Sequence, residues 1–149
     1  MATKPNALQT MSLIYISLIM GVVLFGVMTI FVLGKPAQPQ TEMDILGYSA
    51  IILSILIPIG GIFIYNKLIA EVKEADTKTK LAKWRVATLI RAASIEAPCL
   101  FCVVNIMLSG ADIFLYLYVA LLVLMIFNFP TKNKLFNELQ ITEEELNTA

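Results

Sequence analysis

The chain has 149 residues, of which 58% are hydrophobic and 15% are charged. Soluble domains average about 45–50% apolar and about 25% charged residues, so this composition excludes a water-soluble domain and indicates a protein embedded in lipid. The 11 basic and 11 acidic residues cancel, which excludes the strongly basic surface that nucleic acids bind. Because the chain contains no histidine, haem ligation through imidazole, Ser-His-Asp catalysis and His-based zinc sites are also excluded.

Four apolar stretches are expected to cross the membrane, because about 20 apolar residues in a helix span the hydrocarbon layer. They run from Met11 to Leu33, from Ile45 to Tyr65, from Val86 to Leu108 and from Ile113 to Phe129. The first stretch is longer than the apolar region of a signal peptide and no small-residue cleavage site follows it, so we expect it to be retained. We therefore predict an all-α integral membrane protein, a four-helix bundle that forms one domain over residues 1–149.

The basic residues are distributed unevenly between the loops, which predicts the orientation of the chain. Only Lys35 lies between the first two spans, whereas five lysines and one arginine lie in the segment 66–85. Basic loops stay in the cytoplasm, so we expect this segment and both termini inside, and the protein in the inner (plasma) membrane. The segment contains good helix formers and no proline or glycine, so helices two and three should extend beyond the bilayer as a cytoplasmic hairpin. A solvated connection and a surface for a partner protein both fit it.

The cytoplasmic tail, residues 130–149, contains a short amphipathic pattern. Leu135, Phe136 and Leu139 lie at helical spacing beside basic residues, which is typical of a helix at the membrane surface. Thr142 and Glu145 have the spacing of a capping box, although we expect a frayed end because few residues follow. Aromatic residues near the ends of the third and fourth spans match the belts that anchor membrane helices, namely Trp84, Phe114, Tyr116, Tyr118, Phe127 and Phe129.

The third span carries two charged residues, Arg91 and Glu96. Such residues usually face the interior of a bundle or a water-filled cavity, because a charge in the hydrocarbon layer is costly. Counted from Arg85, they lie about 9 Å and about 16 Å into the membrane, so Arg91 can reach the headgroups and Glu96 reaches them less easily. They are about 140° apart around the helix, so each needs its own partner. In apolar surroundings, the carboxyl of Glu96 is expected to be protonatable near neutral pH.

Prolines interrupt the hydrogen bonding of two spans near the depth of these charges. Pro98 leaves the carbonyl of Ser94 without its helical donor, and Pro58 does the same for Ser54. Free carbonyls beside a carboxyl are the components of a proton or cation site, which makes Glu96, with Arg91, Ser94 and Ser54, the candidate. The alternative is that the prolines are tolerated kinks without a ligand.

The spans also contain glycines and two cysteines whose positions bear on helix packing. Gly21, Gly60 and Gly61 lie at a shared depth, which predicts close helix packing. Cys99 and Cys102 form a Cys-x-x-Cys pattern in the middle of a span, where we interpret both as small buried apolar residues. No glycine-rich phosphate loop and no acidic metal cluster occurs, so no cofactor and no metal are expected.

The stretch from Arg91 to Cys102, RAASIEAPCLFC, resembles the ion-carrying helix of the proteolipid (c) subunit of rotary ATP synthases. In that family an intramembrane carboxylate is followed by a small residue and then by a Leu-Phe pair, and here Glu96, Ala97 and Leu100-Phe101 stand in those places. The resemblance implies a protonatable Glu96. The chain has neither the duplicated carboxylate nor the glycine-repeating partner helix of that family. As a whole it resembles uncharacterised four-helix bacterial inner-membrane proteins with an Arg and a Glu on one span, which implies no activity.

We do not expect an enzyme, because no nucleophile and base are paired at a recognisable spacing. The favoured hypothesis is a structural or accessory subunit of a membrane assembly, with Arg91 and Glu96 as packing or subunit contacts. The alternative is a proton- or cation-coupling protein that uses Glu96. Small residues four apart, at Ala93 and Ala97, allow association with a second copy or with another membrane protein. The lipid bilayer is the one partner that composition itself predicts.

Overall fold

The computed structural model describes residues 7–34, 45–143 and 145, and this part of the chain contains helices and no strand. Its elements in order are α1 (Ala7–Val27), η1 (Met28–Leu33), α2 (Ile45–Ala70), α3 (Thr77–Ser109), α4 (Asp112–Phe127) and α5 (Lys132–Leu139). The η1 element is a π-helical continuation of α1, which the sequence does not predict. The expectation of an all-α protein is confirmed.

Three helical segments, Leu8–Leu33, Ile45–Ala70 and Thr77–Ser109, are long and apolar enough to cross a membrane. The chain is therefore a membrane protein by the length and composition of its helices. The first segment begins before Met11, because the polar residues Gln9 and Thr10 continue the helix. The fourth expected span is shorter than predicted: α4 has 16 residues, and a bend of 70° separates it from α5.

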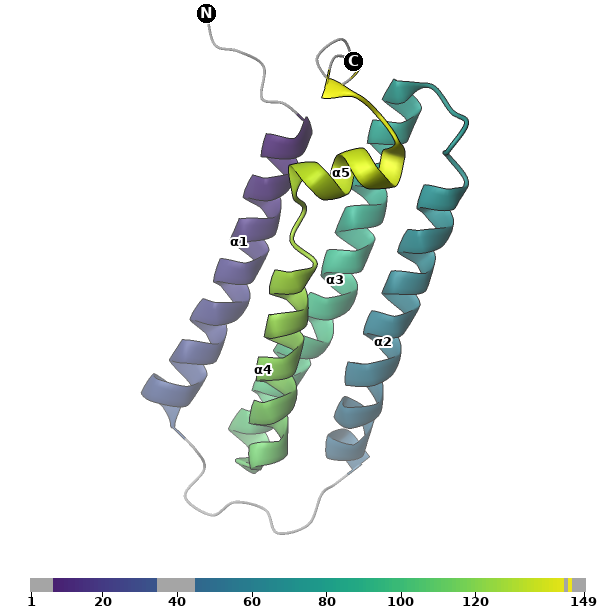
Figure 1. Ribbon diagram of the computed structural model, residues 1–149. Helices are drawn as coiled ribbons and strands as arrows, with labels where there is room; N and C mark the ends of the chain where they lie inside the picture. Colours follow the sequence, from purple (N-terminus) through teal and green to yellow (C-terminus); the bar gives the residue numbers. More distant parts are fainter. Residues whose placement is uncertain (1–6, 35–44, 144, 146–149) are drawn as a thin grey trace, which may run out of the picture.

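The long helices are arranged around α3, which contacts α1, α2 and α4 (Figure 1). Two tyrosines join α1 to α4: the hydroxyl of Tyr15 donates to the carbonyl oxygen of Met125 at 3.1 Å, and that of Tyr118 donates to Val22 at 3.1 Å. The start of α1, the turn between α2 and α3, and α5 all lie at one end of the molecule (Figure 1). We call this the hairpin end.

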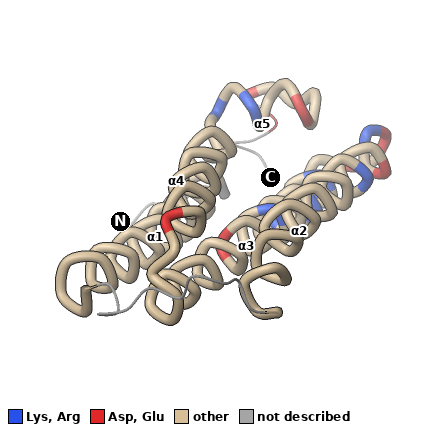
Figure 2. Tube along the Cα trace, turned by 90° about the horizontal axis from the view of Figure 1, so that it is seen from below, with Lys and Arg blue, Asp and Glu red and all other residues tan. Residues whose placement is uncertain are grey.

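The segment between α2 and α3 is a helical hairpin, as its helix-forming residues predict. Helix α2 continues to Ala70, and α3 begins at Thr77, where Asp76 caps it by accepting a hydrogen bond from the Thr79 amide at 3.2 Å. Hydrogen bonding from the Thr79 side chain, followed by that from its backbone amide, lowers the pKa of the Asp76 carboxyl. Charged residues gather around this turn and on α5, and few occur along the middle of the long helices (Figure 2).

At the opposite end, a tight turn joins α3 to α4. Gly110 ends α3 in the left-handed conformation, with φ of 68°, and its amide donates to Ile106 at 2.9 Å. Glycine adopts this conformation without the strain that a side chain would add. Because α4 starts two residues later, it must return alongside α3, as the short linker predicts.

Helix α5 lies across the hairpin end (Figure 1). Thr131 caps it by accepting a hydrogen bond from the Lys134 amide at 3.4 Å. Its apolar residues Leu135 and Leu139 are buried in a cluster with Trp84 and Ala87 of α3. The sequence predicts a helix that turns its apolar side to lipid, but these two leucines contact the protein itself, because α5 folds back over the ends of its neighbours.

Candidate functional site

Arg91 lies on the face of α3 that is turned inward, and its side chain is only 6% exposed. Its guanidinium carbon lies 3.7 Å from the centre of the Tyr65 ring, so α2 supplies a cation–π contact. Its Nη2 donates to the carbonyl oxygen of Asn128, just beyond α4, at 3.3 Å. Within the described part of the chain, no carboxylate forms a salt bridge with Arg91. Aromatic and carbonyl partners of the chain thus hold the guanidinium of Arg91, and whether it also lies at the depth of the headgroups stays a prediction.

Glu138 of α5 connects this arginine to the rest of the hairpin end. Its Oε2 accepts a hydrogen bond from the Tyr65 hydroxyl and a second one, at 3.3 Å, from Nε1 of Trp84. Helices α2, α3 and α5 thus meet through one carboxylate. We call Arg91, Tyr65, Trp84, Asn128 and Glu138 the Arg91 cluster.

A second cation, Lys134, lies close to the Arg91 cluster. Its Nζ donates to the carbonyl oxygens of Phe127 at 2.6 Å and of Phe129 at 3.4 Å, so it satisfies carbonyls at the end of α4. Burial lowers the pKa of Lys134, and the positive charge of Arg91 lowers it further. The charge of the Glu138 carboxylate, which accepts hydrogen bonds from Tyr65 and Trp84, acts in the opposite direction and raises the pKa of Lys134.

Glu96 lies apart from the Arg91 cluster. Its side chain is half-buried, and its neighbours Ala93 and Ala97 on α3 are exposed. No recorded hydrogen bond or ion pair among the described residues involves its carboxylate, and none joins it to Arg91, Ser94 or Ser54. The structure does not bring these four residues together into one site.

The two serines next to the prolines lie at the contact between α2 and α3. The hydroxyl of Ser94 donates to the carbonyl oxygen of Arg91 at 2.8 Å. The hydroxyl of Ser54 is 3.2 Å from Sγ of Cys102, close enough for a hydrogen bond in either direction. Pro58 and Pro98 are buried, and both helices continue through them. Their neighbourhood is an interhelical contact within the chain.

The glycines differ in what surrounds them. A Cβ atom on Gly61 would lie 1.9 Å from Oγ of Ser94, so this glycine allows α2 and α3 to approach closely. A Cβ atom on Gly21 or Gly60 would meet nothing within 4 Å, so neither makes the close contact that their depth suggests. Gly26, which the sequence does not single out, lies against the Tyr118 hydroxyl, 2.2 Å from where its Cβ atom would be.

The cysteines and several aromatic residues belong to the core. Cys99 and Cys102 are free and buried, as expected, and each thiol also contacts an oxygen atom, on Tyr118 and on Ser54 respectively. Trp84, Phe114 and Tyr118 are at most 5% exposed, so the prediction that they anchor the helices in the lipid is wrong for these three. They face neighbouring helices, and two of them place a polar atom on a buried acceptor. Tyr116 and Phe127 are exposed, as expected of anchors.

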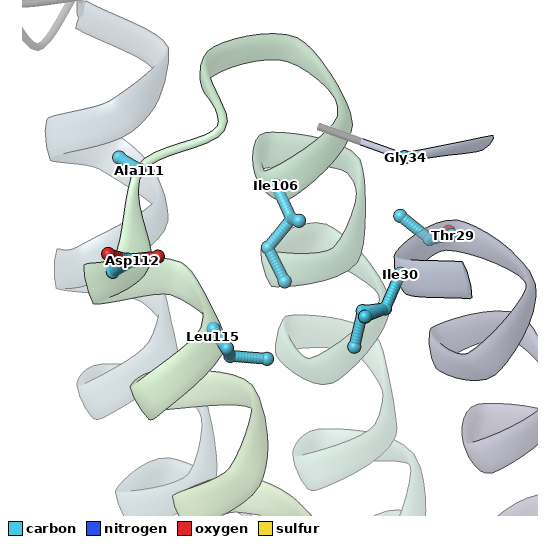
Figure 3. Close-up of a pocket in the computed structure, with 7 residues that line it drawn as sticks. All are labelled: Thr29, Ile30, Gly34, Ile106, Ala111, Asp112 and Leu115. Carbon is cyan, nitrogen blue, oxygen red and sulfur yellow. The ribbon is translucent and has the colours of Figure 1, made fainter. Parts of the chain in front are cut away.

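A small cavity of about 60 Å³ lies at the end opposite α5, between η1, α3 and α4. Figure 3 shows Ile30, Ile106 and Leu115 pointing toward one another there, with Thr29 and Asp112 at its margin. Its lining is mostly apolar. No group of three or more potential metal ligands occurs in the described ranges, and the cavity adds none.

No protein-family model, no curated protein and no solved structure matches this chain.

Sequence reasoning found Arg91 but missed the partners that surround it. Tyr65 and Trp84 lie near the ends of the apolar stretches and Asn128 follows the last one, where aromatic and amide residues are common. Glu138 belongs to a tail that the hydrophobic pattern does not place in space. One signal was available: an arginine buried in a span requires an acceptor at its own depth. That acceptor is the carbonyl oxygen of Asn128, and Tyr65, near the end of the second span, adds its aromatic ring.

Proposed function

We propose that this protein is a small multi-pass protein of the inner membrane that acts as a non-enzymatic structural or accessory subunit of a membrane assembly. In this proposal α4, with the residues up to the bend before α5, forms a fourth span of a four-helix bundle. Both termini and the α2–α3 hairpin then lie in the cytoplasm, in agreement with the basic residues at the hairpin end.

One observation carries the proposal: the polar side chains inside the long helices are used to join helices of this chain. Arg91 binds Tyr65 of α2 and Asn128 beyond α4, and Ser54 of α2 contacts Cys102 of α3. Among the described residues, none of these polar groups has a recorded contact with Glu96, as a site for a transported ion at this residue would require. Polar groups used in this way support a scaffold, because interhelical hydrogen bonds and close packing drive helix association in lipid.

The exposed side of α3 around Glu96 is where the proposal places a contact with the rest of an assembly. A photoreactive amino acid at Ala97, in the full chain in its own membrane, should give one discrete crosslinked protein that mass spectrometry identifies. The same probe at Phe63, an exposed residue of α2, provides the control for lipid-facing positions. Lipid adducts alone at both positions would contradict an accessory subunit that uses this surface.

The alternative function is proton or cation coupling through Glu96. The observation that favours it is the half-buried carboxylate, for which no hydrogen-bond partner is recorded in the described part of the chain. Carbodiimide labelling across pH, with and without sodium, tests it, because the reagent modifies a protonated carboxyl in apolar surroundings. Labelling of Glu96 that titrates near neutral pH or is blocked by sodium, together with ion flux in proteoliposomes that Glu96→Gln abolishes, would replace the scaffold proposal.

A further inference from the structure

Two buried polar atoms on the inner face of α3 lack a hydrogen-bond partner within the described residues, Nε of Arg91 and Oγ1 of Thr88. Arg91 is 6% exposed and Thr88 is fully buried. Residues three apart in a helix lie on one face, with Cβ atoms about 5–6 Å apart. The long arginine side chain also leans toward the N-terminal end of its helix, which is the direction of Thr88. The two unused groups therefore lie in one region.

Positive charge in this region is only partly neutralised, because Arg91 and Lys134 are two cations and the nearby Glu138 is one carboxylate, whose charge acts to raise the pKa of Lys134. A guanidinium carries five N–H donors, and within the described residues Arg91 donates one hydrogen bond, to the carbonyl oxygen of Asn128. Lys134 donates to two carbonyls, which leaves one of its three N–H donors unused. The carboxylate of Glu138 accepts from Tyr65 and Trp84, and among the described residues it forms no salt bridge with either cation. Buried charges in proteins are normally paired, so an anion from outside the chain would complete this arrangement.

We propose that Arg91, Thr88 and Lys134 form a binding site for a phosphate group beneath α5. The planar donors of arginine match the oxygens of a phosphate, the threonine hydroxyl donates to a further oxygen, and the lysine supplies a second positive charge. The site lies at the hairpin end, which the proposed function places on the cytoplasmic side. In other membrane proteins, basic pockets between helices on that side bind anionic headgroups. An anionic phospholipid and free inorganic phosphate offer the same chemistry.

In this proposal, helix α5 shields the site from solvent. Arg91 and Thr88 are closed off in this structure, so a phosphate reaches them when α5 moves outward. The helix is joined to α4 only by residues 128–131 and is held by the bonds of Glu138 and by the buried leucines of α5. Trp84 is the only tryptophan of the chain and donates to Glu138, so its fluorescence reports a displacement of α5.

The experiment uses the full chain in two media. In non-ionic detergent it is titrated with sodium phosphate, against sodium chloride at equal ionic strength. In nanodiscs, phosphatidylcholine is compared with mixtures that contain phosphatidylglycerol. The readouts are Trp84 fluorescence and the thermal unfolding midpoint. The variants are Arg91→Gln and Thr88→Val, and the matched control is Arg85→Gln, which removes an exposed cation from the same helix.

The wild type should show a saturable change in fluorescence and a raised midpoint. A response to phosphatidylglycerol alone assigns the site to a headgroup, and a response to phosphate assigns it to the free anion. Thr88→Val should weaken binding about tenfold, the equivalent of one hydrogen bond to a charged group, and Arg91→Gln at least as much, with Arg85→Gln unchanged.

Thr88→Val keeps the proposal testable if Arg91→Gln does not fold, because valine has nearly the same shape as threonine and removes only the unsatisfied hydroxyl. Its apo stability should stay equal to the wild type or rise. The absence of a saturable response beyond chloride in both media would overturn the proposal. So would a Thr88→Val variant that binds as tightly as the wild type.

Discussion

Substitution of two neighbouring glycines of α2 provides a sharp test of how α2 packs on α3. In Gly61→Ala, the new methyl group would lie 1.9 Å from Oγ and 2.3 Å from Cβ of Ser94. In Gly60→Ala, the new methyl group would meet nothing within 4 Å. Both changes gain the same helix propensity, about 1 kcal/mol, so that contribution cancels when the two variants are compared.

The difference in stability between the two variants then reflects the steric clash of the new methyl group with Ser94 in Gly61→Ala. Overpacking a well-packed contact by a methyl group costs about 1–3 kcal/mol, and a Cβ atom of Ser94 cannot move away without its helix. We expect Gly61→Ala to be less stable than Gly60→Ala by about 1–3 kcal/mol, and Gly60→Ala to exceed the wild type by up to about 1 kcal/mol. Ser94→Gly in the Gly61→Ala background should restore most of the difference.

The assay is equilibrium unfolding in mixed detergent micelles, followed by the fluorescence of Trp84. The double-mutant cycle of Gly61→Ala and Ser94→Gly gives the coupling between the two positions directly. A Gly61→Ala variant as stable as Gly60→Ala, or a cycle without coupling, would refute the close approach of α2 and α3 at this point.

Three further predictions concern the contacts of the hairpin end and the orientation of the chain in the membrane. Glu138→Ala should destabilise the protein by about 1–3 kcal/mol and change the emission of Trp84, because it leaves two partly buried donors without an acceptor; unchanged emission would contradict the described contacts. A charged maleimide added outside sealed cells should label Ile45→Cys and not Glu74→Cys, since the native cysteines are buried, and the reverse result would invert the proposed orientation. The pKa of the Asp76 carboxyl is lowered in the folded protein, so the stability that its cap contributes is present at pH values above the usual pKa of aspartate and is lost as pH falls through the lowered pKa. The free energy of unfolding measured from pH 6 to pH 2 should show this loss. Asp76→Asn should remove this part of the pH dependence.

The membrane-spanning helices could be predicted from the sequence because apolar length alone determines them. The stretch from Ile45 and that ending near Ser109 were placed within a residue or two at those ends. Pro130 lies in the break between α4 and α5, where a proline is expected to end a helix, but the bend of 70° at this break could not be predicted from the sequence. The π-helical turn after Val27 has no sequence signal of its own.

The candidate site was predicted less well, because its partners come from distant parts of the chain. Arg91 stood out as a charge in an apolar span, but the acceptor that it contacts follows α4, and the aromatic ring that it contacts belongs to α2. Glu138 was hidden in a polar tail, where a carboxylate is ordinary. Helical periodicity gives the face on which a residue lies, and only the fold gives what faces it.

The central position of α3 bears on how the protein is made. Helix α1 is joined by hydrogen bonds to α4 and packs on α3, and α2 packs chiefly on α3, so the first two helices leave the ribosome before any of their principal partners exist. During synthesis they must remain in the bilayer as separate helices, or be held by an insertase, until the segment from Thr77 to Phe127 follows them. Assembly is then completed in a single late step, which makes the order of translation part of the folding pathway.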